Sequence, residues 1–510
     1  MRWEPPRPLL PLSRPPLARA ALTLLVLLPA AAFAQFPQGL LDALTEAVEL
    51  YRQSRAEVLR VATDPNERRE VLAGPALFQR HEPAEVFVFG DEAFEAELDR
   101  GAGLGRGEGW GPPPNPARGR RIHDGERGGL DASSCRSCHF VGGPDGSGRL
   151  SQVAALRGDG QRLSTATLRD PPHVMGLGYL VRVARETEAA LRRRTQIAQE
   201  QARAGGEPVR THLTVGERDF GFITAFPDGT MSTDALRGIS TDLRVRPLGH
   251  KGRHADLVSL ADEALQVHLG IQTDSRIATY GEESGVWLGE GTRFDPDSDG
   301  VQAEATGSQA VLLGAYLSML PVPQIRPPDD PRLAFVWSRG YAAFTEVGCA
   351  ACHVPALRVR DMNTVLTATD ATVEYRLDLA REGQAPRPQR VDFGADEMNA
   401  VPGGTPIYAF TDLQRHDMGP ALADAEDERL PDGSGTVPAS VWLTRPLWGL
   451  ADTGPYLHDG RASTVEEAIM AHGGEAVPSR DAYTALDDMG RAALRVFLAS
   501  LTRDPVILVE

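Results

Sequence analysis

Two short stretches of this 510-residue chain repeat one pattern of thiols and imidazole: residues 135–139 read Cys-Arg-Ser-Cys-His and residues 349–353 read Cys-Ala-Ala-Cys-His. Two thiols separated by two residues can both form thioethers with one porphyrin, and the histidine that follows is then turned toward the iron. The pattern therefore predicts two covalently attached c-type haems. The residues that this prediction assigns to attachment are Cys135, Cys138, Cys349 and Cys352, with His139 and His353 as proximal iron ligands.

A redox-active dithiol and a zinc site are the competing interpretations of a Cys-x-x-Cys pair. Neither of them explains why both pairs are followed by histidine and why the chain has no cysteine outside them. We therefore prefer haem attachment, and we expect no structural disulfide although the predicted compartment is oxidising.

The sixth coordination position of each iron decides whether a haem only transfers electrons or also binds a small molecule. For the second haem the predicted sixth ligand is Met418, because residues 417–420 read Asp-Met-Gly-Pro and favour a turn; His416 is the rival ligand. For the first haem the candidates are His173 and Met175, and either could equally be a packed loop residue.

Polar residues near the C-terminus offer further contacts to a haem. His458, Asp459 and Arg461 cluster in one predicted loop, and Arg461 could pair with a haem propionate or form a surface salt bridge. His472 ends a predicted helix, where a histidine favours the C-terminal dipole, so we expect it to cap the helix first and to contact haem second.

Three carboxylates at alternate positions, Asp295, Asp297 and Asp299, precede Gly300 and resemble the opening of a calcium-binding loop. Thr306 stands at the twelfth position, where such a loop has a bidentate glutamate. An ordinary Asp/Gly turn is therefore the alternative to a calcium site.

The first residues have the features of a secretory signal. Four arginines precede the apolar run at 20–33, and Ala-Phe-Ala at 32–34 fits a small-residue cleavage site. We predict a signal peptide over residues 1–34 and a periplasmic mature protein that is soluble, because no later segment is apolar enough to span a membrane. The formal net charge of -17 argues against a nucleic-acid binder, which needs a basic face.

The elements that must position these residues are mainly helical by their apolar spacing. Helices are expected within 38–100 and over 185–205, 242–262, 308–320, 333–347, 464–472 and 487–501, and the arginines at 192–194 are expected on a solvated face. Five prolines between 321 and 331 exclude a helix interior there and suggest a boundary. We predict a mainly α fold with long irregular loops, divided into an N-terminal haem domain at 35–326 and a C-terminal cytochrome c domain at 327–510.

With these motifs in view, the C-terminal part resembles the dihaem oxidoreductase family, which is related to bacterial dihaem cytochrome c peroxidases. The resemblance covers residues 333–502, and residues 135–139 and 171–180 resemble the family more loosely. The motifs that carry it are Gly-Cys-Ala-Ala-Cys-His-Val-Pro at 348–355, His-Asp-Met-Gly-Pro at 416–420, Arg-Pro-Leu-Trp-Gly-Leu at 445–450, Tyr-Leu-His-Asp-Gly-Arg at 456–461 and His-Gly-Gly-Glu-Ala at 472–476.

This resemblance implies two cytochrome c-like haem domains, with His139 and His353 as proximal ligands, and a peroxidase activity. Its electrons would come from an external donor such as a small cytochrome or a cupredoxin. After its Gly-Leu-Gly motif the family often has a glutamate that could transfer a proton, but the aligned residue here is Val181. Peroxide cleavage would then depend on Glu186 or on another acid.

The sequence thus favours a periplasmic dihaem c-type oxidoreductase that is peroxidase-like, with one haem for electron transfer and one for chemistry. The alternative is a non-catalytic dihaem electron-transfer protein. No catalytic residue is assigned, and the substrate is expected to be a small oxidant such as peroxide.

Overall fold

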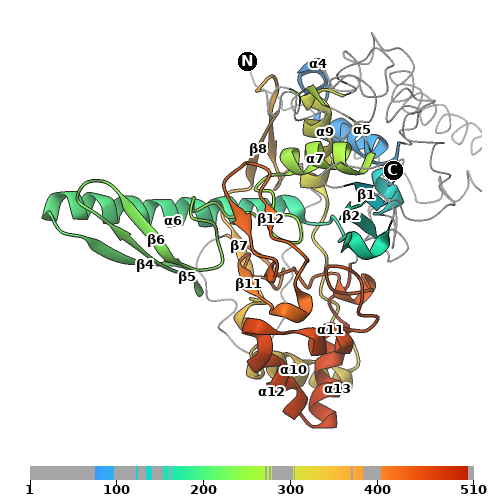
Figure 1. Ribbon diagram of the computed structural model, residues 1–510. Coiled ribbons are helices and arrows are strands. Elements are labelled where there is room, and N and C mark those ends of the chain that lie inside the picture. The colour runs from blue at the N-terminus through green and yellow to red at the C-terminus, as the bar shows by residue number, and fades with distance from the viewer. Residues whose placement is uncertain are drawn as a thin grey trace, which may run out of the picture.

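The computed structural model describes most of the chain between residues 75 and 503. The described residues are 75–96, 122–124, 132, 134–139, 153–159, 162–269, 271, 273–274, 277, 303, 305–368, 371–382 and 404–503. Helices account for 42% of the structure and strands for 20%, and the strands form several small sheets (Figure 1). The prediction of a mainly α fold made of two cytochrome c-like domains is therefore wrong. The prediction failed because most of the strands are too short for an alternation of apolar and polar residues to be visible in the sequence.

Four helices contribute to the first hydrophobic core, which includes the buried Tyr316. Helices α4 (Pro75–Arg80) and α5 (Pro83–Glu95) come first, and α5 packs on α9 (Gly307–Met319), which also contacts α7 (Leu257–Leu269). The ring of Tyr316 lies 5.1 Å from that of Phe87 and 5.3 Å from that of Phe94. Gly90 permits this approach, since a Cβ atom there would come within 2.5 Å of the Cβ of Tyr316. Helix α9 is buried along its length, as its almost wholly apolar sequence requires.

A small sheet lies next to this core. It consists of β1 (Ile122–Asp124), β2 (Ala154–Gly158) and β3 (Thr167–Arg169), with β1 parallel and β3 antiparallel to β2. Residues 170–176 connect β3 directly to α6, so the sheet determines the position in space at which this segment starts.

Helix α6 (Leu177–Gly205) is the longest helix that the structure describes and projects to the left in Figure 1. An antiparallel sheet of β4 (Val209–Val215), β5 (Arg218–Ala225) and β6 (Met231–Leu236) packs along it. The predicted helix at 185–205 is confirmed, and the arginines at 192–194 are exposed as expected.

The C-terminal helices form a second core at the opposite end of the molecule (Figure 1). Helix α10 (Pro331–Glu346) packs on α13 (Asp488–Leu498) through Gly340, where any Cβ atom would collide with the carbonyl oxygen of Ala493. Helix α11 (Val465–Ala471) begins at the Thr464 cap, with Glu467 completing the capping box. The predicted helices at 333–347, 464–472 and 487–501 are confirmed, whereas α12 (Val477–Ala485) was not predicted.

Short strands pair in the chain between α10 and α11. The pairs are β7 (Leu357–Val359) with β10 (Thr405–Ile407), β8 (Asn363–Thr367) with β9 (Glu374–Asp378), β11 (Arg415–Asp417) with β14 (Val441–Leu443) and β12 (Glu428–Arg429) with β13 (Thr436–Val437). The β8–β9 pair packs in the first core. Single 3-10 turns are η3 (Cys135–Ser137), η5 (Leu163–Thr165), η7 (Cys349–Ala351), η8 (Pro420–Leu422), η9 (Leu450–Asp452) and η10 (Gly474–Ala476). Buried side chains from 357–448 join the first core, so both ends of the chain contribute to it. The predicted limits of the domains remain a prediction.

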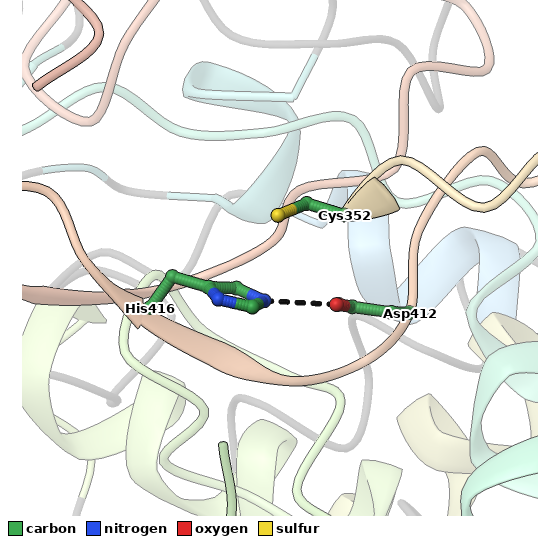
Figure 2. A group of neighbouring side chains, drawn as sticks. All are labelled: Cys352, Asp412 and His416. Atoms are coloured by element: carbon green, nitrogen blue, oxygen red, sulfur yellow. Dashed lines mark hydrogen bonds and ion pairs between the residues drawn. The ribbon is translucent and has the colours of Figure 1, made fainter. Parts of the chain in front are cut away.

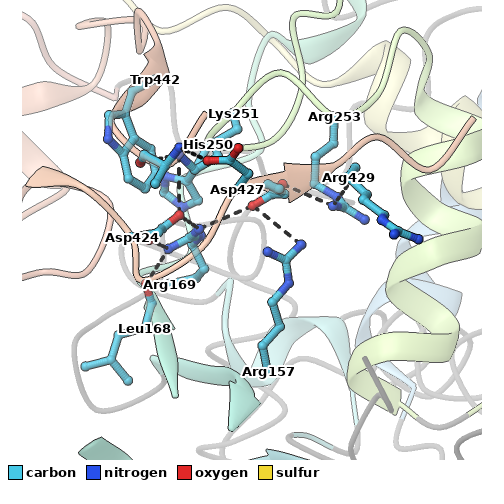
Figure 3. Close-up of polar contacts among 12 residues, drawn as sticks. Arg157, Leu168, Arg169, His250, Lys251, Arg253, Asp424, Asp427, Arg429 and Trp442 are labelled. Atoms are coloured by element: carbon cyan, nitrogen blue, oxygen red, sulfur yellow. Dashed lines mark hydrogen bonds and ion pairs between the residues drawn. The ribbon is translucent and has the colours of Figure 1, made fainter. Parts of the chain in front are cut away.

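A buried ionic cluster joins residues 157–253 to residues 424–442 (Figure 3). Arg169 donates both terminal nitrogens to Asp424, at 3.0 and 2.6 Å, and the ammonium of Lys251 lies 3.4 Å from the same carboxylate. Arg253 pairs with Glu428 at 3.1 Å. Because buried charges are tolerated only when paired, this cluster fixes the two segments against each other.

The signal-peptide prediction lies outside the described residues, as does the proposed calcium loop at 295–299. Among the residues that the structure describes, none forms a helix both long and apolar enough to cross a bilayer.

Candidate haem-attachment sites

The two Cys-x-x-Cys-His motifs fold in the same way. In each, the first three residues form a 3-10 turn, η3 or η7, and the second cysteine and the histidine follow. The amide of His139 donates to the carbonyl of Cys135 at 3.1 Å, and the amide of His353 donates to the carbonyl of Cys349 at 2.9 Å. A single turn of this kind keeps the two cysteines and the histidine of each motif close together along the backbone, as attachment of one porphyrin requires.

Burial keeps the histidines of both motifs neutral. The Nδ1 atom of His353 lies 3.0 Å from the carbonyl oxygen of Phe410. The Nδ1 atom of His139 is buried and has no hydrogen-bond partner among the described residues. Burial lowers the pKa of both histidines to about 4, against the opposing effects of the main chain of Pro172 on His139 and of Phe410 on His353. Both rings are thus neutral at pH 7, the form in which histidine ligates a metal, and the Phe410 carbonyl leaves Nε2 of His353 for one.

The first thiol of each pair does not have the properties of a redox-active thiol. All four cysteines are free and half-buried. Burial raises the pKa of Cys135 to about 12 and that of Cys349 to about 11. Reactive Cys-x-x-Cys pairs need the opposite shift, because the thiolate is the nucleophile.

A zinc site is equally poorly supported. Within the described ranges, one group of side chains could hold a metal ion: Cys352, Asp412 and His416, whose ligand atoms lie within 4.8 Å of one another (Figure 2). It includes a single thiol of the second pair, whereas a structural zinc site needs four ligands.

His416 is held by two carboxylates. Its Nε2 atom lies 2.8 Å from Asp412 and its Nδ1 atom 2.9 Å from Glu475. Burial lowers the pKa of His416, but the hydrogen bond to Asp412 and the neighbouring Cys352 sulfur outweigh it and raise the pKa. Because both ring nitrogens are engaged, His416 is a poor candidate for the sixth ligand.

Met418 and His472 are brought close to each other. Met418 is half-buried and donates its amide to the carbonyl of Ser440 at 2.9 Å. A Cβ atom on Gly473 would come within 2.6 Å of the carbonyl oxygen of Met418, so the Met418 turn rests against the end of α11. The Nδ1 atom of His472 lies 2.7 Å from the carbonyl of Ala468, in the expected capping role. His472 is also near enough to the second proximal histidine to lower its pKa.

The two candidate ligands of the first haem are both packed residues. His173 is buried, and its Nε2 atom lies 3.0 Å from the carbonyl oxygen of Trp448. Met175 is only 1% exposed. Val181, at the family's glutamate position, is buried in α6, and the carboxylate of Glu186 accepts two main-chain amides at 2.8 and 2.9 Å.

Residues 445–450 lie between the surroundings of the two motifs. The amide of Leu447 donates to Ala409 at 3.0 Å, one residue before the carbonyl that receives His353. On the other side, Gly176 leaves room for the ring of Trp448, which a Cβ atom there would approach to 2.7 Å. The Arg-Pro-Leu-Trp-Gly-Leu motif therefore contacts Ala409, next to the residue that faces His353, and Gly176, which precedes α6.

A buried carboxyl that the sequence did not reveal lies beside this segment. The amide of Asp170 donates to the carbonyl oxygen of His458 at 2.7 Å, and the Nε2 atom of His250 lies 2.9 Å from the carbonyl oxygen of Asp170. One of the carboxylate oxygens is buried and has no partner. Burial and the charge of Asp459 raise the pKa of Asp170 to about 7. Nothing in its sequence context indicates this, because the contacts come from distant segments.

The His458 loop has a structural role. The ring of His458 stacks on that of Trp442 with centroids 3.9 Å apart. Arg461 pairs with Asp459 at 2.6 Å and donates to the carbonyl of Ala421 at 3.0 Å. Of the two interpretations of Arg461, the salt bridge is the one observed.

One protein family and several solved structures are similar to parts of this chain. Residues 387–501 match the family described as "Di-haem oxidoreductase, putative peroxidase". No curated protein matches the sequence. Similar solved structures include the hydrazine synthase of Kuenenia stuttgartiensis (16% identity, TM-score 0.22), for which the match covers 44% of this chain and 66% of the other, just under two thirds. A MauG-like protein associated with microbial copper homeostasis matches with 16% identity and TM-score 0.25, over 54% of this chain and 77% of the other.

Proposed function

We propose that this chain, whose residues 387–501 belong to the di-haem oxidoreductase family, is a periplasmic dihaem c-type oxidoreductase with peroxidase-like activity. The observation that supports it best is the shared geometry of the two motifs. In both, the histidine amide donates to the carbonyl of the first cysteine. In the second motif Nδ1 of His353 also faces the carbonyl of Phe410, so that its Nε2 is left for iron.

In this proposal each pair of cysteines holds one haem by thioethers, and the carbonyl of Phe410 orients His353. When bound, haem iron supplies one-electron chemistry and, where its sixth position is open, a binding place for a small oxidant. The protein's share is to fix both imidazoles, keep them neutral and bury them away from water.

Mass spectrometry of the purified mature protein tests the attachment. The wild-type chain should carry two haems, and the pair of changes Cys135→Ala and Cys138→Ala should remove one of them while leaving the other. The pair Cys349→Ala and Cys352→Ala should do the converse. A mature chain without added haem would refute the proposal, and its N-terminal residue would report whether cleavage occurs after residue 34.

We further propose Met418 as the sixth ligand of the second haem. His416, the rival ligand, is committed to two carboxylates, which supports this choice. A methionine–iron charge-transfer band should be present in the wild type and absent from Met418→Ala. If the band is missing from the wild type and His472→Ala changes the spectrum instead, His472 is the ligand.

The alternative, a non-catalytic electron carrier, is favoured by one observation. Val181 is buried and Glu186 is tied to main-chain amides, so neither supplies a free acid for peroxide cleavage. A high-spin haem signal that shifts on addition of peroxide or cyanide would support the enzyme, while two low-spin haems in every redox state would support the carrier. Electrons would reach either protein from an external donor such as a small cytochrome or a cupredoxin.

A further inference from the structure

The turn that contains Met418 lies directly against Gly473 and Gly474. A Cβ atom on Gly473 would come within 2.6 Å of the carbonyl oxygen of Met418, and one on Gly474 would come within 2.1 Å of that of Asp417. Gly474 also has a positive φ of 51°, which residues with a Cβ atom rarely adopt. This close approach brings the next residue, Glu475, within reach of the Met418 turn.

Glu475 holds this turn through both of its carboxylate oxygens. The Oε1 atom accepts the main-chain amide of Asp417 at 2.9 Å, and the Oε2 atom lies 2.9 Å from Nδ1 of His416. The carboxylate of Asp417 in turn accepts the amide of Gly419 at 2.8 Å. The residues on both sides of Met418 are therefore fixed by hydrogen bonds that do not involve its thioether.

His416 connects the turn to the second Cys-x-x-Cys-His motif. Its Nε2 atom lies 2.8 Å from Asp412, and the ligand atoms of Cys352, Asp412 and His416 lie within 4.8 Å of one another (Figure 2). Met418 comes two residues after His416 and directly follows β11, so the two side chains leave the extended backbone on the same face. Asp417 between them is exposed whereas both of them are half-buried, as this alternation requires. Met418 is thus on the same side of β11 as Cys352.

We propose that Glu475 is a positioning residue that holds Met418 in place to serve as the sixth ligand of the second haem, an inference that rests on the proposed function. The carboxylate acts through its hydrogen bonds to Asp417 and His416 and is not itself a ligand. A turn that is ordered before its methionine binds iron loses less conformational entropy on ligation, so an external ligand displaces the methionine less readily.

The test measures how readily imidazole displaces Met418 in the haem-loaded protein at pH 7. The quantity compared is the imidazole concentration that removes half of the methionine–iron charge-transfer band. The variants are Glu475→Ala and Glu475→Gln. The matched control is Glu466→Ala, which removes a carboxylate of α11 that is 49% exposed and pairs with Arg495. The Glu475 side chain is 56% exposed, so its removal leaves no cavity and the variants should fold.

Glu475→Ala should lower the half-displacement concentration about fivefold to tenfold, because it removes two hydrogen bonds to a charged and partly exposed acceptor. Glu475→Gln keeps one acceptor oxygen for the amide of Asp417 and should lower the concentration less. Glu466→Ala should leave it unchanged, because Glu466 makes no contact with the Met418 turn among the bonds that the structure describes.

A half-displacement concentration in Glu475→Ala equal to that of the wild type would overturn the inference. An equal decrease in Glu466→Ala would do the same, because a general loosening of the C-terminal helices would then explain both results. If Glu475→Ala does not fold, an unaltered concentration in Glu475→Gln would overturn it. A wild type that carries two haems but lacks the band would also overturn it and leave haem attachment intact, whereas failure of the proposed function would appear as a chain without haem absorption.

Discussion

Replacing Asp170 by asparagine should stabilise the protein at alkaline pH and leave it unchanged in acid. The pKa of Asp170 is raised to about 7 by burial and by the charge of Asp459, from an ordinary value of 3.8. Between these two values the unfolded chain releases a proton that the folded chain retains, so stability falls as pH rises through this window. This rise in the pKa of Asp170 lowers the free energy of unfolding by about 4 kcal/mol at most, because each pKa unit is worth about 1.4 kcal/mol. Asparagine cannot ionise and should remove this loss.

The assay is urea-induced unfolding of the haem-loaded protein, followed by circular dichroism at several pH values from 4 to 8. The difference between Asp170→Asn and wild type should be near zero at pH 4, grow up to pH 7 and then level off. In Asp459→Asn the free energy of unfolding should fall less steeply with pH than in the wild type, because the substitution removes the neighbouring charge. Asp329→Asn, at an exposed position, should give a difference that does not vary with pH. A difference for Asp170→Asn that is constant with pH, or a variant less stable at pH 8, would refute the reasoning.

Three further substitutions test the packing around the sites by the same unfolding measurement. Arg169→Ala should lower the free energy of unfolding by about 3 kcal/mol, because the buried carboxylate of Asp424 then keeps only the ion pair with Lys251. A loss as small as that of an exposed ion pair would contradict this. Thr464→Ala should cost about 1 kcal/mol by removing the cap of α11, and Thr464→Ser should restore it. Gly340→Ala should cost about 3 kcal/mol, since its methyl group collides with the Ala493 carbonyl; an unchanged midpoint would mean that α10 and α13 can separate freely.

Helices were predictable where one face of amphipathic spacing coincided with a terminal residue of the right kind. Helix α13 begins at the Asp487 cap, and α11 has Thr464 and Glu467 as a capping box. The expected helix at 242–262 was only partly right, because α7 begins at Leu257. Residues 242–256 have helical spacing of apolar groups but are instead held by ion pairs such as that between Asp242 and Arg246, at 2.5 Å.

The strands were missed for a different reason. Most consist of two to five residues, and their pairing partners are set by contacts that a short window of sequence does not contain. The longer strands β4 and β5 are an exception. They are joined by the two-residue turn Gly216-Glu217, a local feature that could have been predicted from the sequence. The mainly α expectation followed from periodicity alone and neglected these turns.

At the sites, residue identity could be predicted but their surroundings could not. Cys-x-x-Cys-His spacing is a covalent requirement and is visible in the sequence. The carbonyl that faces His353 belongs to Phe410, far along the chain, and any residue type can supply a carbonyl. The same holds for Asp170, whose pKa is raised by burial and by the charge of Asp459, almost 300 residues away.

The absence of spare cysteines gives the buried ionic cluster a particular importance. If all four cysteines hold haem, no disulfide can link the segments around the two motifs, even in an oxidising compartment. Their relative position then depends on noncovalent contacts, chiefly the Arg169–Asp424 pair and the bond from His173 to Trp448. Both contacts join the segment at 169–173 to the C-terminal half of the chain. A change at Arg169 should therefore alter the spectra of both haems, although Arg169 belongs to neither motif, whereas Arg376→Ala, at an exposed ion pair, should alter neither.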